Sequence, residues 1–233
     1  MLAKDRLIVA LDVPSADQAR SLIETLGDSA GVYKIGLELL FCGGFALAEE
    51  LARDGRAVFV DAKLSDIEAT VERATAAIAR MGAAFLTVHA LDNKTLTAAV
   101  RGRGDAALKL LGVTVLTNLA AADLIEQGID HPLQDLVSHR AALAKTAGLD
   151  GVIASGREAA AIRGAMGRDF VIVTPGVRPH GSDTQDQTRA VTPKDAIAAG
   201  ADYLVVGRPI TRAADPREAA LAIVREIDAA LSG

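Results

Sequence analysis

The sequence is poor in aromatic residues, with five Phe, two Tyr and no Trp among 233 residues. Proteins that bind single-stranded nucleic acid stack bases on aromatic side chains, so this composition argues against such a surface. The formal net charge of −5 also leaves no general positive field that would attract DNA, RNA or an anionic membrane. We therefore expect neither nucleic acid nor a membrane as a partner.

Cysteine and long apolar runs are scarce as well. The single cysteine, Cys42, excludes an internal disulfide. No stretch reaches the ~18 consecutive apolar residues that a transmembrane helix needs, and the first six residues contain no long apolar segment. The sequence therefore predicts a soluble protein of the cytoplasm.

Aliphatic residues are what the sequence has most of, since 50% of it is hydrophobic and only 3% is aromatic. Eight short apolar runs alternate with segments of helical spacing. The runs lie at residues 7–13, 31–37, from 57 onward, 85–90, 108–116, 150–154, 170–174 and 203–206. With no low-complexity linker between them, this alternation predicts an α/β protein, a (β/α)8 TIM barrel formed by residues 1–233 as a single domain. A doubly wound open sheet is the alternative, because local patterns do not show whether a sheet closes.

Charged side chains gather at the ends of the first strands. Asp12 and Lys34 end the first two runs, and Asp61 and Lys63 follow the third, two residues apart, with Asp66 three residues further on. Residues two apart on a strand point to the same side, close enough for their charges to interact. Such charges are costly beside an apolar strand unless they pair or take part in chemistry. Active sites of barrels form at this end of the strands, so the cluster is the predicted chemical centre.

Each of these charges also has a simpler interpretation. A lone strand-end residue such as Asp12 can solvate the mouth of the barrel or cap the next helix. His89 ends the fourth run, but we interpret it as a hydrogen-bonded spacer and not as a catalytic group. Asp61 and Asp66 could hold Mg²⁺ through their carboxylates, although Lys63 between them competes for the same oxygens. No motif with metal-ligand spacing occurs, so no metal site is predicted.

The last two strands carry the features of an anion site. Thr174–Arg178 follows the seventh run and Gly207-Arg208 follows the eighth. Barrels often bind phosphate with the loops after these two strands. Glycine allows main-chain N–H groups to approach an oxyanion, and arginine adds a charge-assisted contact. The polar loop 175–191 is long enough to fold over a ligand, and Gln187 within it could donate to phosphate.

Six segments carry a resemblance to a known family. In chain order they are Leu11-Asp12-Val13-Pro14, Lys34-Ile35-Gly36, Asp61-Ala62-Lys63-Leu64-Ser65-Asp66-Ile67, Thr174-Pro175-Gly176-Val177-Arg178, Asp186-Gln187 and Val206-Gly207-Arg208. Together they resemble the bacterial type of orotidine 5′-monophosphate decarboxylase over nearly the whole chain. The family usually continues Asp-Ile-Pro-Asn-Thr, whereas Glu68 and Ala69 stand in place of the Pro and the Asn here. This departure concerns the start of a helix and removes no charged group of the motif.

The resemblance implies a (β/α)8 barrel that acts as a homodimer with active sites at the subunit interface. It implies a charge network of Lys34, Asp61, Lys63 and Asp66, with Asp66, Ile67 and Thr70 contributed across the interface. Substrate contacts are implied for Asp12 and Lys34 at the ribose, Thr117 at the pyrimidine, and Arg178, Gln187, Gly207 and Arg208 at the phosphate. Lys63 is implied to be the proton donor.

The chemistry that this family carries out fits these residues without a cofactor. Loss of CO2 from C6 of the orotate ring leaves a carbanion, and the chain shows no sign of an imine or thiazolium that would accept its electrons. The protein must then stabilise the negative charge electrostatically and protonate it. An ammonium held beside C6 does both, and carboxylates on either side keep Lys63 charged.

Three alternatives stay open. Relatives on the same scaffold, which are sugar-phosphate decarboxylases or hexulose-phosphate aldolases, use Asp-x-Lys-x-x-Asp with Mg²⁺. Metal dependence and the contact of Thr117 with a pyrimidine distinguish them from the nucleotide decarboxylase. A phosphate-binding isomerase or epimerase would need a carboxylate or histidine base placed for carbon-acid chemistry. A catalytically silent nucleotide-binding or scaffolding barrel would be expected to lack Lys63 or one of its aspartate partners, and all of these are present.

Overall fold

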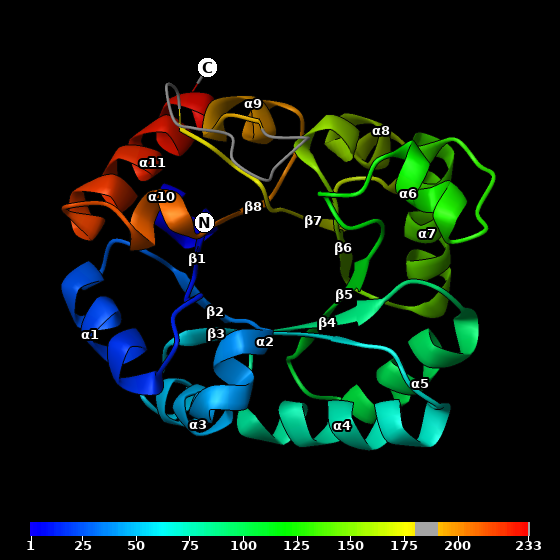
Figure 1. The fold of residues 1–233 in the computed structure, drawn as a ribbon, viewed down its shortest axis with the longest axis horizontal. Coiled ribbons are helices and arrows are strands. Elements are labelled where there is room, and N and C mark those ends of the chain that lie inside the picture. Colours follow the sequence, from blue (N-terminus) through cyan, green and yellow to red (C-terminus); the bar gives the residue numbers. More distant parts are fainter. Residues whose placement is uncertain (180–190, 233) are drawn as a thin grey trace.

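The computed structural model describes residues 1–179 and 191–232. Its eight parallel strands close into a barrel in sequence order, because β1 pairs with both β2 and β8 (Figure 1). The strands are β1 (Leu7–Ala10), β2 (Val32–Ile35), β3 (Ala57–Leu64), β4 (Phe85–His89), β5 (Lys109–Val113), β6 (Gly151–Ile153), β7 (Val171–Thr174) and β8 (Tyr203–Val206). The predicted (β/α)8 architecture is therefore confirmed, and the alternative of an open sheet is wrong.

Helices surround the barrel on its outside (Figure 1). They are α1 (Ala16–Leu26), α2 (Leu37–Leu39), α3 (Phe45–Arg53), α4 (Glu68–Met81), α5 (Asn93–Arg103), α6 (Ala121–Glu126), α7 (Leu133–Ala147), α8 (Gly156–Met166), α9 (Pro193–Ala198), α10 (Arg208–Thr211) and α11 (Pro216–Leu231). Local signals set several ends: Ser15 accepts a hydrogen bond from the Gln18 N–H at the start of α1, and Gly82 ends α4 in the left-handed conformation. None of the helices within the described residues is both long and apolar enough to span a membrane.

Two hydrophobic cores follow from the alternation of side chains along the strands. The larger lies between the strands and the helices and includes Leu7 and Val9, whereas Ile8 between them belongs to the smaller core inside the barrel. The rings of Phe59 and Phe85 meet edge to face inside, with centroids 5.8 Å apart. Because side chains fill the interior at this level, a ligand has room only above it, at the carboxyl ends of the strands.

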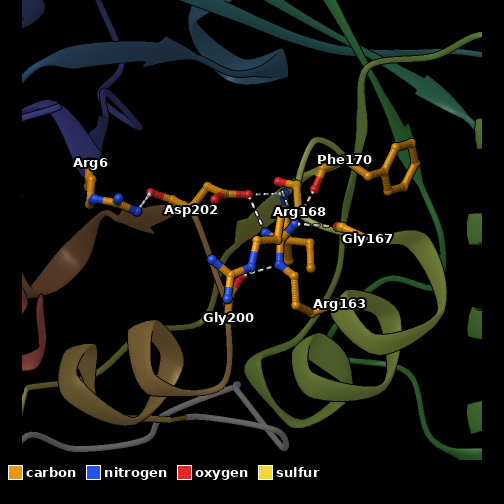
Figure 2. A network of polar contacts seen from close by, with 8 residues as sticks. Arg6, Arg163, Gly167, Arg168, Phe170, Gly200 and Asp202 are labelled. Atoms are coloured by element: carbon orange, nitrogen blue, oxygen red, sulfur yellow. Dashed lines mark hydrogen bonds and ion pairs between the residues drawn. The ribbon is translucent and has the colours of Figure 1, made fainter.

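A polar network stabilises the opposite end of the barrel, where the strands begin (Figure 2). Asp202, just before β8, forms a 2.6 Å ion pair with Arg163 of α8. It also accepts a 2.8 Å hydrogen bond from the Ile172 N–H of β7. The Arg163 guanidinium also donates to the carbonyl oxygens of Gly167, Phe170 and Gly200. The network therefore ties the end of one helix to the starts of two neighbouring strands.

The same arrangement occurs a quarter of the way round the barrel. Asp150, just before β6, accepts from the Leu110 N–H of β5 at 2.8 Å and from Arg103 at the end of α5 at 2.6 Å. In both cases one carboxylate oxygen accepts from a strand N–H and also pairs with an arginine. The polar contacts that stabilise the fold through Asp150 and Asp202 therefore lie at the end of the barrel away from the charged cluster described below.

We expect Asp202→Ala to lower the free energy of unfolding by about 2–4 kcal/mol, because it leaves the Ile172 N–H and the half-buried guanidinium without their partner. Urea unfolding at a fixed protein concentration measures the change. The control is Glu218→Ala, which breaks an ion pair between two exposed side chains, Arg225 and Glu218, and should cost less than about 1 kcal/mol. Equal losses in the two variants would contradict a structural role for the network.

Candidate active site

A cavity of about 530 Å³ opens at the carboxyl ends of the strands. Its floor is made by inward-facing residues of the barrel, among them Ala10, Phe59 and Val205. Eight of the residues that the sequence predicts for the site line this cavity: Asp12, Lys34, Asp61, Lys63, Thr117, Arg178, Gly207 and Arg208. They come from all parts of the chain, and barrel closure brings them together.

Three predicted residues among those described do not line the cavity within one chain. Asp66 and Ile67 are exposed beyond the end of β3, where 73% of Ile67 is open to solvent, and Thr70 lies in the first turn of α4. Asp66 accepts a hydrogen bond from the Ile67 N–H and makes no ion pair with Lys63 among the described residues. Their placement in a neighbouring subunit's site stays a prediction. Gln187 lies outside the described residues.

The charged side chains of the first three strands form an alternating chain. Lys34 Nζ lies 3.1 Å from Asp12 Oδ1 and 3.4 Å from Asp61 Oδ2. The other oxygen of Asp61 accepts from Lys63 Nζ at 2.8 Å. Asp12, Lys34, Asp61 and Lys63 thus alternate in sign along the cavity wall. Both oxygens of Asp61 face an ammonium group, and the described residues contain no group of three or more His, Cys, Asp or Glu side chains that could hold a metal ion.

Burial and charge act in opposite directions on the two most buried members. Burial by itself raises the pKa of Asp61, but the Lys34 and Lys63 ammonium groups, with hydrogen bonds from Lys63 and Thr87, outweigh it and hold that pKa below its ordinary value. Burial likewise lowers the pKa of Lys34, and Asp61 and Asp12 outweigh it and raise that pKa. Asp61 and Lys34 are therefore both charged at neutral pH.

Lys63 has a backbone conformation that the sequence did not predict. Its φ of 48° makes it the only residue other than glycine with a positive φ among the described residues. The pairing of β3 with β4 shifts register between Val60 and Leu64, so the segment carrying Asp61 and Lys63 departs from a regular strand. The expected contact between the two side chains is present, although the simple alternation used to predict it does not hold at Lys63.

Sequence reasoning missed Thr87 of β4. Its hydroxyl oxygen accepts from the Lys63 N–H at 2.9 Å and donates to Asp61 Oδ1 at 2.9 Å. The only signal in the sequence is a hydroxyl residue at an inward-facing position of an otherwise apolar strand. His89, two residues later, does not line the cavity, and burial is the main reason that its pKa is lowered, with Lys63 adding to the effect.

The wall of the cavity that follows the last two strands is basic. Arg178 follows β7, and Arg208 begins α10 directly after β8. Arg212 also lines the cavity, and the sequence analysis did not select it. Gly176 lies between Arg178 and the end of β7 with a φ of 72°, a conformation that side-chain-bearing residues rarely adopt. Three guanidinium groups, all from segments after the last two strands, form a binding surface suited to a phosphate.

Comparison with known proteins shows a match that covers the whole barrel. Residues 5–223 match the family model described as the orotidine 5′-phosphate decarboxylase / HUMPS family. The chain belongs to this family. An orotidine 5′-phosphate decarboxylase of Rhodopseudomonas palustris (strain BisB5) is 54% identical over 224 residues, which cover 96% of this chain and 95% of the relative. One from Methylobacterium sp. (strain 4-46) is 55% identical over 227 residues, covering 96% of each.

Solved structures of the family share the fold. The crystal structure of orotidine 5′-phosphate decarboxylase from Lactobacillus acidophilus superimposes with a TM-score of 0.84 at 36% identity, covering 95% of this chain and 98% of the other. The enzyme from Pyrococcus horikoshii OT3 gives a TM-score of 0.75 at 26% identity, covering 95% and 99%. The family resemblance seen in the sequence motifs is therefore confirmed.

The ionised state of Asp61 predicts a pH-dependent contribution to stability. Because the pKa of Asp61 is lower in the folded than in the unfolded chain, its contribution is complete above the ordinary value of 3.8 and is lost as the pH falls through the folded pKa. We expect Asp61→Asn to cost about 2–4 kcal/mol of unfolding free energy at neutral pH, because two ammonium groups then face each other. Urea unfolding from pH 7 downward should show this difference shrinking below about pH 4. A difference that stays constant to pH 3 would contradict the assignment.

Proposed function

We propose that the protein decarboxylates orotidine 5′-monophosphate to uridine 5′-monophosphate, the last step of de novo pyrimidine nucleotide synthesis in the cytoplasm, without a cofactor. The observation that carries the proposal is the Lys63 ammonium, held 2.8 Å from the buried Asp61 carboxylate in a cavity that three arginines also line. Membership of the family and the names of its relatives support the same reaction.

Lys63 has the chemistry to protonate C6 in the proposed reaction. When the C6–CO2 bond breaks, its electron pair stays on C6, and a nearby ammonium stabilises the developing charge before donating its proton. Asp61 pairs with the Lys63 ammonium and orients it, and Lys34 helps to keep Asp61 ionised. An anionic Asp61 close to the substrate carboxylate would also repel the ground state more than the departing neutral CO2.

The rest of the nucleotide would bind along the cavity. We assign Asp12 and Lys34 to the ribose, Thr117 to the pyrimidine, and Arg178, Gln187, Gly207 and Arg208 to the phosphate. Enzymes lower barriers by roughly 8–23 kcal/mol, more than one lysine supplies. Binding energy from the phosphate, remote from C6, can be used to desolvate and orient the ring.

A homodimer completes this proposal. Asp66 and Ile67 are exposed just beyond the end of β3, and 87% of Phe41, in the helical turn before α3, and 47% of Phe45, the first residue of α3, are also exposed. Apolar side chains left exposed near one edge of a site are typical of a subunit interface. Asp66, Ile67 and Thr70 would then reach the cavity of the neighbouring subunit, and Asp66 would supply the second carboxylate beside Lys63.

We expect purified protein in excess EDTA to consume orotidine 5′-monophosphate, followed as loss of substrate absorbance. Lys63→Ala should lower turnover by at least about 1,000-fold, because it removes both the proton donor and the positive charge, while uridine 5′-monophosphate still binds. Lys109→Ala, at an exposed lysine where β5 begins, is the matched control and should retain normal turnover. Near-normal turnover by Lys63→Ala would contradict the mechanism. A requirement for Mg²⁺ with sugar-phosphate substrates would favour the metal-dependent relatives.

Mixing two inactive variants tests the shared site. Lys63→Ala and Asp66→Ala each disable every site of their own homodimer, but a mixed dimer retains one site with Lys63 from one subunit and Asp66 from the other. After the variants are unfolded and refolded together in equal amounts, we expect about a quarter of wild-type activity. Absence of recovery in a mixture shown to contain mixed dimers would contradict the contribution of Asp66 across the interface.

A further inference from the structure

The backbone of Lys63 needs an external constraint. Left-handed conformations are unfavourable for residues with a Cβ atom, because that atom crowds the following carbonyl oxygen. Lys63 adopts one, with φ 48°, inside the interval where β3 loses its regular pairing with β4. Such a conformation persists only where surrounding contacts determine it. A contact with the surrounding residues must therefore hold the Lys63 backbone in place.

Thr87 provides that contact. It is fully buried on β4, and its Oγ1 lies 2.9 Å from the Lys63 nitrogen. The side-chain oxygen takes the place of the main-chain acceptor that a regular ladder would offer to this N–H. Satisfying a buried N–H matters, because leaving it unpaired costs the full desolvation of the group.

The direction of each hydrogen bond follows from the groups involved. The Lys63 N–H can only donate, so Thr87 Oγ1 accepts there and keeps its own proton for the Asp61 carboxylate, 2.9 Å away. The same Asp61 oxygen accepts from Lys63 Nζ at 2.8 Å. A closed ring results, which runs from the Lys63 backbone through Thr87 and Asp61 back to the Lys63 ammonium.

We propose that Thr87 is a positioning residue, whose hydroxyl fixes the Lys63 backbone and the Asp61 carboxylate together and so aims the ammonium at the reacting carbon. Thr87 itself does not line the cavity. A serine hydroxyl can make both bonds, whereas valine, which has the shape of threonine, can make neither. The inference rests on the proposed role of Lys63.

Two pairs of variants isolate the hydroxyl. We expect Thr87→Val to lower kcat by about 10- to 100-fold and to leave KM within about threefold, because the nucleotide contacts are untouched. Thr87→Ser should retain kcat within about threefold of wild type, while Thr87→Ala loses as much as Thr87→Val. Should the valine variant not fold, the serine and alanine variants, which differ by the hydroxyl alone, make the same comparison.

The matched control is Thr75→Val. Thr75 is also fully buried, on α4, and its hydroxyl has no hydrogen-bond partner among the described residues. It should keep wild-type kcat, and thermal unfolding checks that the variants are folded. Equal kcat for Thr87→Val and Thr75→Val, or for Thr87→Ser and Thr87→Ala, would overturn the proposal while leaving the role of Lys63 intact. Normal turnover by Lys63→Ala would overturn both.

Discussion

Asp61 is a buried carboxylate that stays ionised because groups from three strands reach it. Lys34 comes from β2, Lys63 from β3 itself and Thr87 from β4, and each is within hydrogen-bond or ion-pair distance of one of its two oxygens. An unpaired charge at this depth would be costly, and so would two ammonium groups without the carboxylate between them. The arrangement requires the strands to be in register, and register in a barrel is fixed only when the whole ring closes.

The cavity separates two kinds of charge. Alternating acids and lysines line the side made by the first strands, and arginines line the side made by the last two. A phosphate bound at Arg178 and Arg208 would therefore leave the ion pairs at Asp61 undisturbed. Under the proposed function this separation lets one end of the nucleotide supply binding energy while the other end meets a fixed electrostatic environment that does not have to reorganise during the reaction.

Much of the fold and many of the cavity residues could be predicted from the sequence. Alternating strand and helix patterns predict the barrel, and Asp61, Lys63 and Arg208 stand at strand ends that barrel geometry brings to one face. The first strand ends at Ala10, three residues before the end of the predicted run 7–13. A hydrophobic pattern does not reveal where the hydrogen bonds between strands stop. The left-handed conformation of Lys63 and its contact with Thr87 depend on the register of β3 against β4. This register relates two separate segments of the chain, so the local sequence pattern does not predict it. Arg212 was missed for a similar reason, since nothing in its sequence surroundings marks a side chain that reaches the cavity.

The pairing of β1 with β8 has a consequence for synthesis of the chain. It places Asp12, from the first loop, and Arg208, from the last, on the wall of one cavity. A nascent chain on the ribosome has released every residue of the charge cluster once β4 has emerged, but Arg208 and Arg212 of the basic wall follow only when the last part of the chain leaves the exit tunnel. A ligand that needs both groups of residues therefore has no complete site until synthesis is nearly finished, and seven of the eight strands must remain soluble with two unpaired strand edges until β8 arrives.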